Sequence, residues 1–273
     1  MAGRLIVVAG AGDVGGRLAA LRALRGDEVI AVRRRVQPLA AGVRAVAADL
    51  VGGAGLDRLP KRPDAVVFAA APDAREEVAY RRLFVDGIRR LLDAFAEAPA
   101  RFVLVSSTAV YGEDGGEWVD EDTPPRPPAF NGRVLLQAEQ TLAADCAGAL
   151  VLRLSGLYGP GREHLLRRAL AGAPGRPHWT CRIHVADAAA ALSHLLDLPT
   201  PAPLYLGSDD CPAREDELFA WLRARSGLPT LPALAGAESG RRVSNRRLRA
   251  SGWEPRFPDF RAGYGALLAG RGQ

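Results

Sequence analysis

A glycine-rich turn near the N-terminus constrains the fold of this chain more than any other feature. The apolar run Leu5–Ala9 leads directly into Gly10-Ala11-Gly12-Asp13-Val14-Gly15, and a helical pattern follows from Asp13 to Arg25. In such a strand–turn–helix motif the first glycine permits the tight turn, the second lets a pyrophosphate approach the backbone, and the third lets helix and strand pack closely. We therefore predict dinucleotide binding at the start of this helix, by Gly10, Gly12, Asp13, Val14 and Gly15.

Short apolar runs alternate with helical patterns through the first two thirds of the chain. The predicted strands are Leu5–Ala9, Glu28–Arg33, Arg44–Ala48, Ala65–Ala70, Phe102–Ser106 and Leu150–Leu154, and the predicted helices are Asp13–Arg25, Arg75–Ala96 and Asn131–Cys146. This alternation predicts an α/β fold, a Rossmann-type doubly wound parallel sheet with helices on both faces. The acid- and proline-rich segment Glu113–Pro128 has no regular period, so we predict a surface loop there.

The pattern becomes less regular after Leu154. Pro203–Leu206 is a further predicted strand, and the predicted helices are Asp187–Leu196, Arg214–Ser226, Ser244–Ser251 and Asp259–Leu268. We predict a Rossmann core over 1–160, to which the chain returns at 183–207. Residues 161–182 and 208–273 should then form a small C-terminal lobe that covers a substrate at the carboxyl edge of the sheet.

The end of the second predicted strand bears on cofactor choice. NAD-binding folds usually carry an acid there to bind the ribose 2′-hydroxyl, but this strand ends in Arg33-Arg34-Arg35. A guanidinium binds a 2′-phosphate through paired charge-assisted bonds, whereas a carboxylate repels it. We therefore predict that Arg33 and Arg34 contact NADP, with NAD as the alternative cofactor and a solvated arginine turn as the alternative structure.

Composition argues against several other classes of protein. The net charge of +5 comes from basic residues interspersed with acids, which does not indicate a nucleic-acid partner. The chain has no leader-like N-terminus and no run of roughly 18 apolar residues, so we expect no membrane span. Its three cysteines form no C-x-x-C pair, which predicts neither disulfides nor a metal site and favours a cytoplasmic protein. We expect a small-molecule substrate and a monomer or homodimer.

Further motifs resemble the extended short-chain dehydrogenase/reductase family, which includes nucleotide-sugar epimerases and dehydratases. They are Asp49-Leu50, Ala69-Ala70-Ala71, the run from Phe102 to Gly112, the run from Gly156 to Arg162, and the run from Arg182 to Asp187. The resemblance implies that Asp49 and Leu50 lie at the adenine and that Ala69, Ala70 and Ala71 line the cofactor. It also implies that Ser107 is the active-site hydroxyl.

The chain departs from that family at the acid–base pair. The family uses a tyrosine and a lysine four residues later, the lysine lowering the tyrosine's pKa. Asn131 and Leu135 occupy those positions, and the sole lysine, Lys61, has no tyrosine four residues before it. Thr108-Ala109 replaces the Asp-Glu pair of the dehydratases, and Phe84 lies near the place of a further active-site asparagine. Together with Gly132-Arg133 and Ala138-Glu139, these departures resemble the family's atypical branch.

A replacement proton source is therefore needed if the chain is an enzyme. We predict Ser107, Asn131 and Tyr158 as catalytic residues, with Tyr111 or water as alternative donors and structural packing as the other role open to both tyrosines. Predicted substrate ligands are Thr108, Tyr111, Arg133 and Arg162. The sequence favours an NAD(P)-dependent oxidoreductase or epimerase acting on a hydroxyl or carbonyl carbon, such as that of a sugar derivative. The alternative is a non-catalytic NADP-binding sensor or interaction protein.

Overall fold

The computed structural model describes residues 3–35 and 37–270, and the chain divides into two compact units. Unit 1 consists of Met1–Tyr111, Pro125–Arg153 and Ala189–Tyr205. Unit 2 consists of Gly112–Pro124, Leu154–Ala188 and Leu206–Gln273. Each unit is therefore assembled from three separate segments of the chain.

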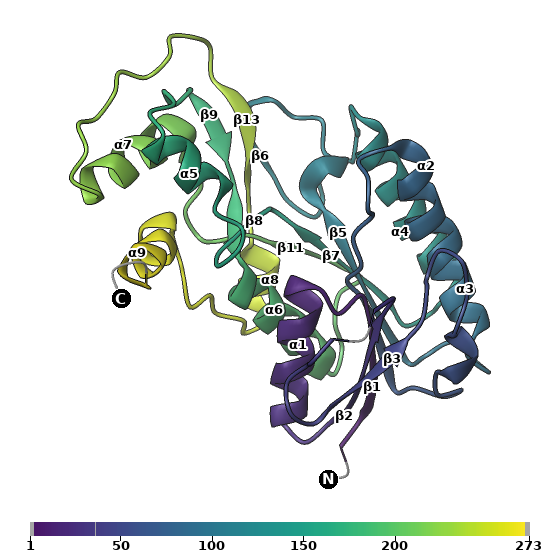
Figure 1. Ribbon diagram of the computed structural model, residues 1–273. Helices are drawn as coiled ribbons and strands as arrows, with labels where there is room; N and C mark the ends of the chain where they lie inside the picture. Colours follow the sequence, from purple (N-terminus) through teal and green to yellow (C-terminus); the bar gives the residue numbers. More distant parts are fainter. Residues whose placement is uncertain (1–2, 36, 271–273) are drawn as a thin grey trace. The chain divides into compact units, whose positions relative to one another are not determined.

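Unit 1 is built on a mostly parallel sheet, for which the described residues give seven strands in the order β11-β7-β5-β4-β1-β2-β3 (Figure 1). The strands are β1 (Leu5–Ala9), β2 (Glu28–Arg33), β3 (Val43–Ala47), β4 (Ala65–Phe68), β5 (Arg101–Ser107), β7 (Ala149–Leu154) and β11 (Leu204–Gly207). β1 pairs in parallel with both β2 and β4. The strands of this sheet are nearly continuous apolar runs, because both faces of the sheet are covered.

Helices cover both faces of this sheet (Figure 1). α1 (Asp13–Leu24) and α6 (Val185–Asp197) lie on one face. α2 (Glu77–Tyr80), α3 (Ile88–Asp93) and α4 (Phe130–Asp145) lie on the other. The predicted Rossmann-type α/β fold is thus confirmed, with most strands within one or two residues of their predicted bounds.

One predicted helix differs from the observed structure. The segment expected as a single helix over Arg75–Ala96 contains α2, then a π-helix over Arg81–Gly87 (η2), then α3. A π-helix is rare because it widens the turn, and it occurs preferentially near functional sites. Apolar spacing alone does not distinguish it from an α-helix, because the buried residues from Leu83 to Leu91 recur three or four positions apart. Leu83, Phe84 and Gly87 are buried on it.

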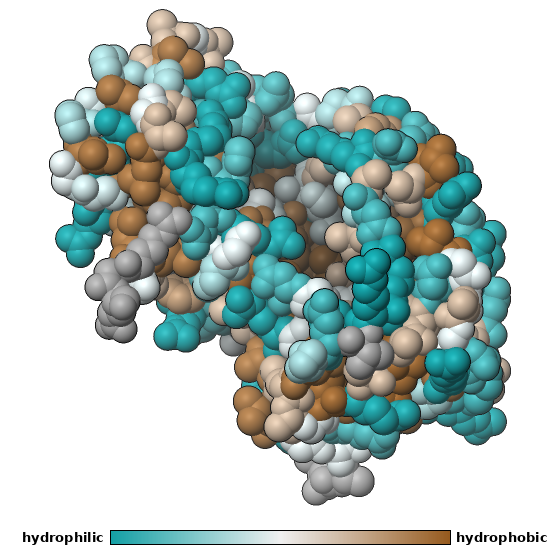
Figure 2. All heavy atoms as spheres, in the orientation of Figure 1, coloured by the Kyte–Doolittle hydropathy of each residue, from teal (hydrophilic) through white to brown (hydrophobic). Residues whose placement is uncertain are grey.

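Unit 2 combines helices with two small sheets. Its helices are α5 (His164–Leu170), α7 (Glu215–Arg225), α8 (Arg246–Ala250) and α9 (Phe260–Gly270). β8 (Gly156–Tyr158) pairs with β10 (Arg182–His184), and β12 (Ala213–Arg214), β9 (His178–Thr180), β13 (Ser239–Val243) and β6 (Gly115–Val119) form the other sheet. Apolar residues gather on the surface over α5, α7 and α9 (Figure 2).

The prediction of a surface loop over Glu113–Pro128 was wrong for residues 115–119. Gly115–Val119 forms β6, which pairs in parallel with β13. Its partner lies far along the chain, so local composition gave no sign of the pairing. The Arg242 guanidinium on β13 stacks on the Trp118 ring of β6, 5.2 Å from its centroid, and also on Trp179 of β9 at 4.9 Å. These contacts tie the three strands together.

Candidate functional site

The glycine turn of unit 1 has the geometry that a dinucleotide requires. Gly10 has φ +93°, and a Cβ there would lie 2.3 Å from the Ala70 nitrogen. A Cβ on Gly15 would lie 2.3 Å from the Gly10 oxygen. At Gly12, by contrast, a Cβ would meet no heavy atom within 4 Å among the described residues. The first and third glycines thus serve backbone packing, while the second leaves its backbone accessible.

Helix α1 begins at this turn with Asp13, and Val14 is buried beneath it. Gly12 is the N-cap residue and, in the described part of the chain, no side chain caps α1. No side-chain cap therefore competes with an anion at this helix start, and the helix dipole favours an anion there. Asp13 pairs with Arg17 one turn on, with Nε and Oδ1 3.1 Å apart.

Small residues after β4 lie directly against the turn. The Ala69 N–H donates to the Ala9 oxygen at 2.8 Å, which extends the β1–β4 pairing beyond the strands themselves. The close approach of Ala70 to Gly10 leaves no room for a larger residue at position 10. Ala71 follows Ala70 at the same carboxyl edge of the sheet. The observed spacing explains why alanines stand at these positions.

The ends of β2 and β3 carry the predicted adenosine-side residues. Arg33 is the last residue of β2 and is half-buried, whereas Arg34 and Arg35 are exposed. Arg34 forms a two-bond ion pair with Asp73, a residue that the sequence analysis did not single out. Asp49 follows β3, and its carboxylate accepts the N–H of Val51 at 3.0 Å and that of Gly52 at 2.9 Å.

These turn bonds hold the Asp49 carboxylate at the carboxyl edge of the sheet. The neighbouring Leu50 is buried, and a Cβ on Gly87 of the π-helix would lie 3.0 Å from the Leu50 oxygen. The π-helix therefore packs against this turn.

Ser107 ends β5 at the same edge. Its Oγ accepts the N–H of Ala109 at 3.1 Å and so caps the short 3-10 helix η3 (Thr108–Val110). Within the described residues no acceptor takes the Ser107 hydroxyl hydrogen, so this hydroxyl can donate to an oxygen of a bound molecule. Thr108 begins η3 and is half-buried.

A buried polar network supports the end of β5. The Ser106 hydroxyl donates to Glu139 of α4 at 2.5 Å, and Arg153 of β7 donates to both oxygens of the same carboxylate, at 3.1 Å from Nε and 2.6 Å from Nη2. Arg153 also donates to the Tyr111 hydroxyl at 2.8 Å. Desolvation acts against the Arg153 charge, but the bonds to Glu139 outweigh it and raise the pKa of the guanidinium. Tyr111 is fully buried at 0% exposure and packs as part of this network.

The start of α4 brings Asn131 beside η3. A Cβ on Gly132 would lie 2.2 Å from the Ala109 oxygen, so only glycine permits this contact between helix and turn. Asn131 is half-buried, Leu135 is buried, and Arg133 is exposed with a 3.3 Å bond to the Pro128 oxygen. Unit 1 thus places Ser107 and Asn131 on adjoining elements.

An aromatic cluster that the sequence analysis missed packs behind Asn131. The Tyr80 ring lies 5.4 Å from Phe130, the residue before Asn131, and 5.6 Å from Phe84 of the π-helix. Phe84 in turn lies 6.1 Å from Phe68 at the end of β4. Such pairs fix the start of α4 against the sheet edge.

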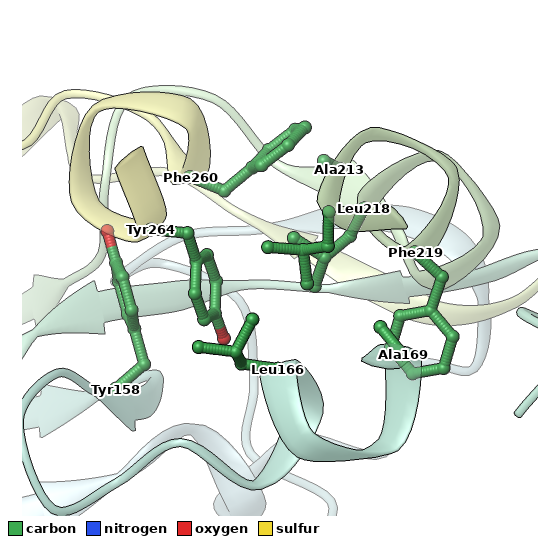
Figure 3. Packing of buried hydrophobic residues seen from close by; sticks show 9 residues of the cluster. Tyr158, Leu166, Ala169, Ala213, Leu218, Phe219, Phe260 and Tyr264 are labelled. Carbon is green, nitrogen blue, oxygen red and sulfur yellow. The ribbon is translucent and has the colours of Figure 1, made fainter. Parts of the chain in front are cut away.

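Tyr158 belongs to unit 2, where it ends β8. Its ring stacks on Tyr264 at 4.7 Å in an apolar cluster with residues of α5, α7 and α9 (Figure 3). The hydroxyl is buried without a hydrogen-bond partner among the described residues, and burial raises its pKa further above the ordinary tyrosine value. A raised pKa opposes proton release near neutral pH. The catalytic role of Tyr158 stays a prediction.

The predicted ligand Arg162 and two other side chains of unit 2 with chemical potential, His184 and Cys181, have structural contacts. Arg162 is exposed, and its N–H donates to the Gly159 oxygen at 2.9 Å. His184 accepts the Ala186 N–H at Nδ1, 3.2 Å away, and packs on Phe257 at 4.1 Å. The Cys181 thiol donates to the Arg241 oxygen at 3.3 Å, and burial raises its pKa to about 11. The raised pKa keeps the thiol protonated near neutral pH, and a protonated thiol is a poor nucleophile.

Unit 2 also buries two charged side chains whose burial the sequence analysis did not predict. Asp209 is 1% exposed and Arg182 is 2% exposed. Within the described residues, both Asp209 carboxylate oxygens and the Nε and Nη1 of Arg182 lack a hydrogen bond. Desolvation raises the pKa of Asp209 to about 8, while Arg182 stabilises its charge in part and the nearby Cys211 backbone contributes least. Asp209 stands between Ser208 and Asp210 in the sequence, a polar run that is typical of an exposed turn, so local pattern gave no sign of its burial.

Unit 1 therefore holds the features of a dinucleotide site: an uncapped helix start, an open glycine and a guanidinium-bearing strand end. These fit a nicotinamide dinucleotide, because its pyrophosphate needs backbone approach and N–H donors. In the described residues no group of three or more His, Cys, Asp or Glu side chains is placed to bind a metal ion. No helix within these same ranges is long and apolar enough to cross a membrane.

Comparisons with known proteins agree with this description. A model of the NAD dependent epimerase/dehydratase family matches residues 6–203. A solved structure from Methylobacillus flagellatus, described as an NAD-dependent epimerase/dehydratase, has a TM-score of 0.87 and 38% identity, and the match covers 99% of each chain.

Two curated proteins are also similar. Protein YeeZ of Escherichia coli strain K12 is 34% identical over 154 residues, so the match spans only about half of each chain, 55% of both. The 3-diazoavenalumate denitrifying reductase of a Streptomyces species is 29% identical over 309 aligned positions, covering 96% of this chain and 99% of that protein.

Proposed function

The chain belongs to the NAD-dependent epimerase/dehydratase family, and we propose that it is an NADP-dependent oxidoreductase acting on a hydroxyl or carbonyl carbon. The observation that carries this proposal is the Ser107 hydroxyl at the carboxyl end of β5, in the same unit as the glycine turn after β1. In open parallel sheets, ligands bind along that edge. The family is NAD(P)-dependent; the preference for NADP rests on Arg33 and Arg34.

When bound, a nicotinamide dinucleotide supplies or accepts a hydride. Around it, Gly12 and the first turn of α1 would hold the pyrophosphate, and Asp49 would lie at the adenine. Arg33 would bind the 2′-phosphate with charge-assisted hydrogen bonds. Ala69, Ala70 and Ala71 would line the other side of the glycine turn.

Ser107 and Asn131 would orient the substrate oxygen. The Ser107 hydroxyl hydrogen can donate to that oxygen because Oγ already accepts from Ala109. The Asn131 side-chain amide adds a second donor from the adjoining helix. Fixed donors of this kind stabilise negative charge that develops on an oxygen. Neither group releases a proton near neutral pH, so water would protonate the product oxygen.

A second candidate function follows from that missing proton donor. The chain carries Asn131 and Leu135 where related enzymes carry tyrosine and lysine, and its full-length relative is named as a denitrifying reductase of a diazo compound. A diazonium carbon that takes up a hydride releases N2 and forms a C–H bond, and this exchange balances without any proton. An active site without an acid–base pair would suit such a substrate.

Cofactor binding provides the first test. NADPH and NADH are titrated into the purified protein by nicotinamide fluorescence, with Arg33→Asp as the test variant and Arg62→Asp as its control. Arg62 precedes β4 at the opposite end of the strands and is highly exposed. We expect tighter binding of NADPH, reversed only in Arg33→Asp. Failure of both cofactors to bind would contradict the proposed function.

Turnover provides the second test. NADPH oxidation is followed with panels of carbonyl compounds, nucleotide sugars and diazonium salts. We expect Ser107→Ala to lower kcat with the carbonyl panel, whereas Ser226→Ala, an exposed control at the end of α7, should not. Turnover confined to diazonium salts favours the second candidate. Binding without turnover in any panel favours a sensor and would contradict the enzyme.

A further inference from the structure

The Arg34–Asp73 ion pair lies beyond the carboxyl ends of β2 and β4, the strands on either side of β1. Arg34 Nη2 and Asp73 Oδ1 are 2.5 Å apart, and Nη1 forms a second bond to Oδ2. This arrangement engages both terminal nitrogens of the guanidinium with one carboxylate. It is the same two-bond geometry by which arginine binds a phosphate. The fork of Arg34 therefore cannot bind both partners in this way at once.

The pair bridges strands that are not neighbours. Arg34 directly follows β2, Asp73 follows β4, and β1 lies between these strands in the sheet. Because adjacent strands are roughly 5 Å apart, the two chains are about 10 Å apart where they leave the sheet. The Arg34 side chain and the segment from Ala69 to Asp73 together span the end of β1, the strand that leads into Gly10.

Among the described residues, Asp73 is the one carboxylate that hydrogen-bonds the Arg34 guanidinium. The bonds to Asp73 are the largest cause of its raised pKa, and Asp49 contributes least, through charge alone. Both members of the pair are well exposed, with 59% of the Arg34 side chain and 64% of the Asp73 side chain accessible. Exposed pairs are weak and exchange partners readily. Asp73 thus holds Arg34 with a bond that a phosphate can replace.

We propose that Asp73 tunes cofactor preference by competing with the 2′-phosphate of NADP for Arg34. This inference rests on the proposed function, since it takes NADP as a ligand of unit 1. Asp73 both occupies the guanidinium and places a negative charge near the incoming phosphate. NAD, which lacks that phosphate, does not depend on Arg34 for its ribose. Asp73 therefore lowers the discrimination between the two cofactors that the arginines would otherwise give.

The test is a set of NADPH and NADH titrations on position 73. Asp73→Asn keeps the size of the side chain and removes its charge. Since an exposed pair contributes little, we expect NADPH to bind about two- to fivefold more tightly, with NADH changed by less than about twofold. Glu97→Gln is the matched control, because Glu97 forms an exposed ion pair with Arg62 near the opposite ends of the strands. It should change neither affinity.

A double-mutant cycle assigns the effect to Arg34. Arg34→Ala should weaken NADPH binding more in the Asp73→Asn background than in the wild type, because only there is the guanidinium free for the phosphate. Equal losses in the two backgrounds would overturn the competition. So would weaker binding of both cofactors in Asp73→Asn, which would instead mean that the pair retains the dinucleotide. If the wild type binds neither cofactor, the proposed function itself fails. If the wild type binds NADPH and Asp73→Asn leaves its affinity for NADPH unchanged, this inference alone fails.

Discussion

Replacing the buried carboxylate Asp209 should change how the stability of unit 2 depends on pH. The ordinary pKa of an aspartate is about 3.9, whereas burial raises that of Asp209 to about 8 in the folded protein. Between these values the folded state retains a proton that the unfolded chain has released. The free energy of unfolding of the wild type therefore falls as pH rises through this window, and Asp209→Asn removes that contribution.

The expected size follows from proton linkage. One pKa unit corresponds to about 1.4 kcal/mol, so the contribution of Asp209 changes by about that amount per pH unit inside the window. From about pH 5 to about pH 7 the wild type should lose roughly 3 kcal/mol relative to Asp209→Asn. The cause is that ionised Asp209 would be buried with neither oxygen hydrogen-bonded among the described residues.

Urea unfolding followed by tryptophan fluorescence measures this difference in the right part of the chain. All four tryptophans, Trp118, Trp179, Trp221 and Trp253, lie in segments of unit 2. Glu217→Gln is the control, because it likewise replaces a carboxyl group by an amide, but at an exposed position of the same unit, where Glu217 pairs with Arg261 at 2.7 Å. The control and the wild type should show the same pH dependence. Parallel stability curves for Asp209→Asn and the wild type would refute the reasoning and mean that folded Asp209 is ionised beside Arg182.

Three other substitutions test the site and its support. Gly10→Ala should abolish measurable NADPH binding in the fluorescence titration, because the turn has φ +93° and no space for a Cβ; retained binding would contradict the assigned turn. Glu139→Gln should lower the free energy of unfolding by about 3–5 kcal/mol, since it leaves the buried Arg153 charge without a carboxylate partner; a loss below about 1 kcal/mol in urea unfolding would count against the network. Gly263→Ala should lower it by about 1–3 kcal/mol in the tryptophan assay, because a Cβ would overlap the Tyr158 hydroxyl; unchanged stability would show that the ring moves aside freely.

Much of unit 1 was predictable because its strands are buried on both faces and its first turn has a specific glycine spacing. β1 and β2 have their predicted bounds. The π-helix within Arg75–Ala96 was not predictable, since a π-turn changes hydrogen bonding without a clear change in apolar spacing. β6 was missed because its strand partner, β13, lies far along the chain.

The candidate site likewise has parts that local sequence pattern predicts and parts that it does not. Ser107 and the glycines follow strands, so their positions at the sheet edge come from local pattern. Side-chain pairs at this edge do not follow from local pattern. Asp73 is separated from Arg34 by 39 positions, and Arg153 from Tyr111 by 42. Side-chain pairs of this kind depend on which strand ends adjoin, which the topology alone decides. The sequence therefore predicted which sheet edge carries the site, but not the side-chain partners that orient the residues there.

The segmented composition of the two units has a consequence for how the protein acquires its structure during synthesis. Gly112–Pro124 emerges from the ribosome long before its β-sheet partner Ser239–Val243, and unit 1 is complete only when Ala189–Tyr205 has been made. Such long-range pairings close large loops and form slowly. Nascent chains that end before Tyr205 expose an unpaired sheet edge, which is a template for aggregation. Translation speed over the middle of the chain should therefore affect the yield of folded protein.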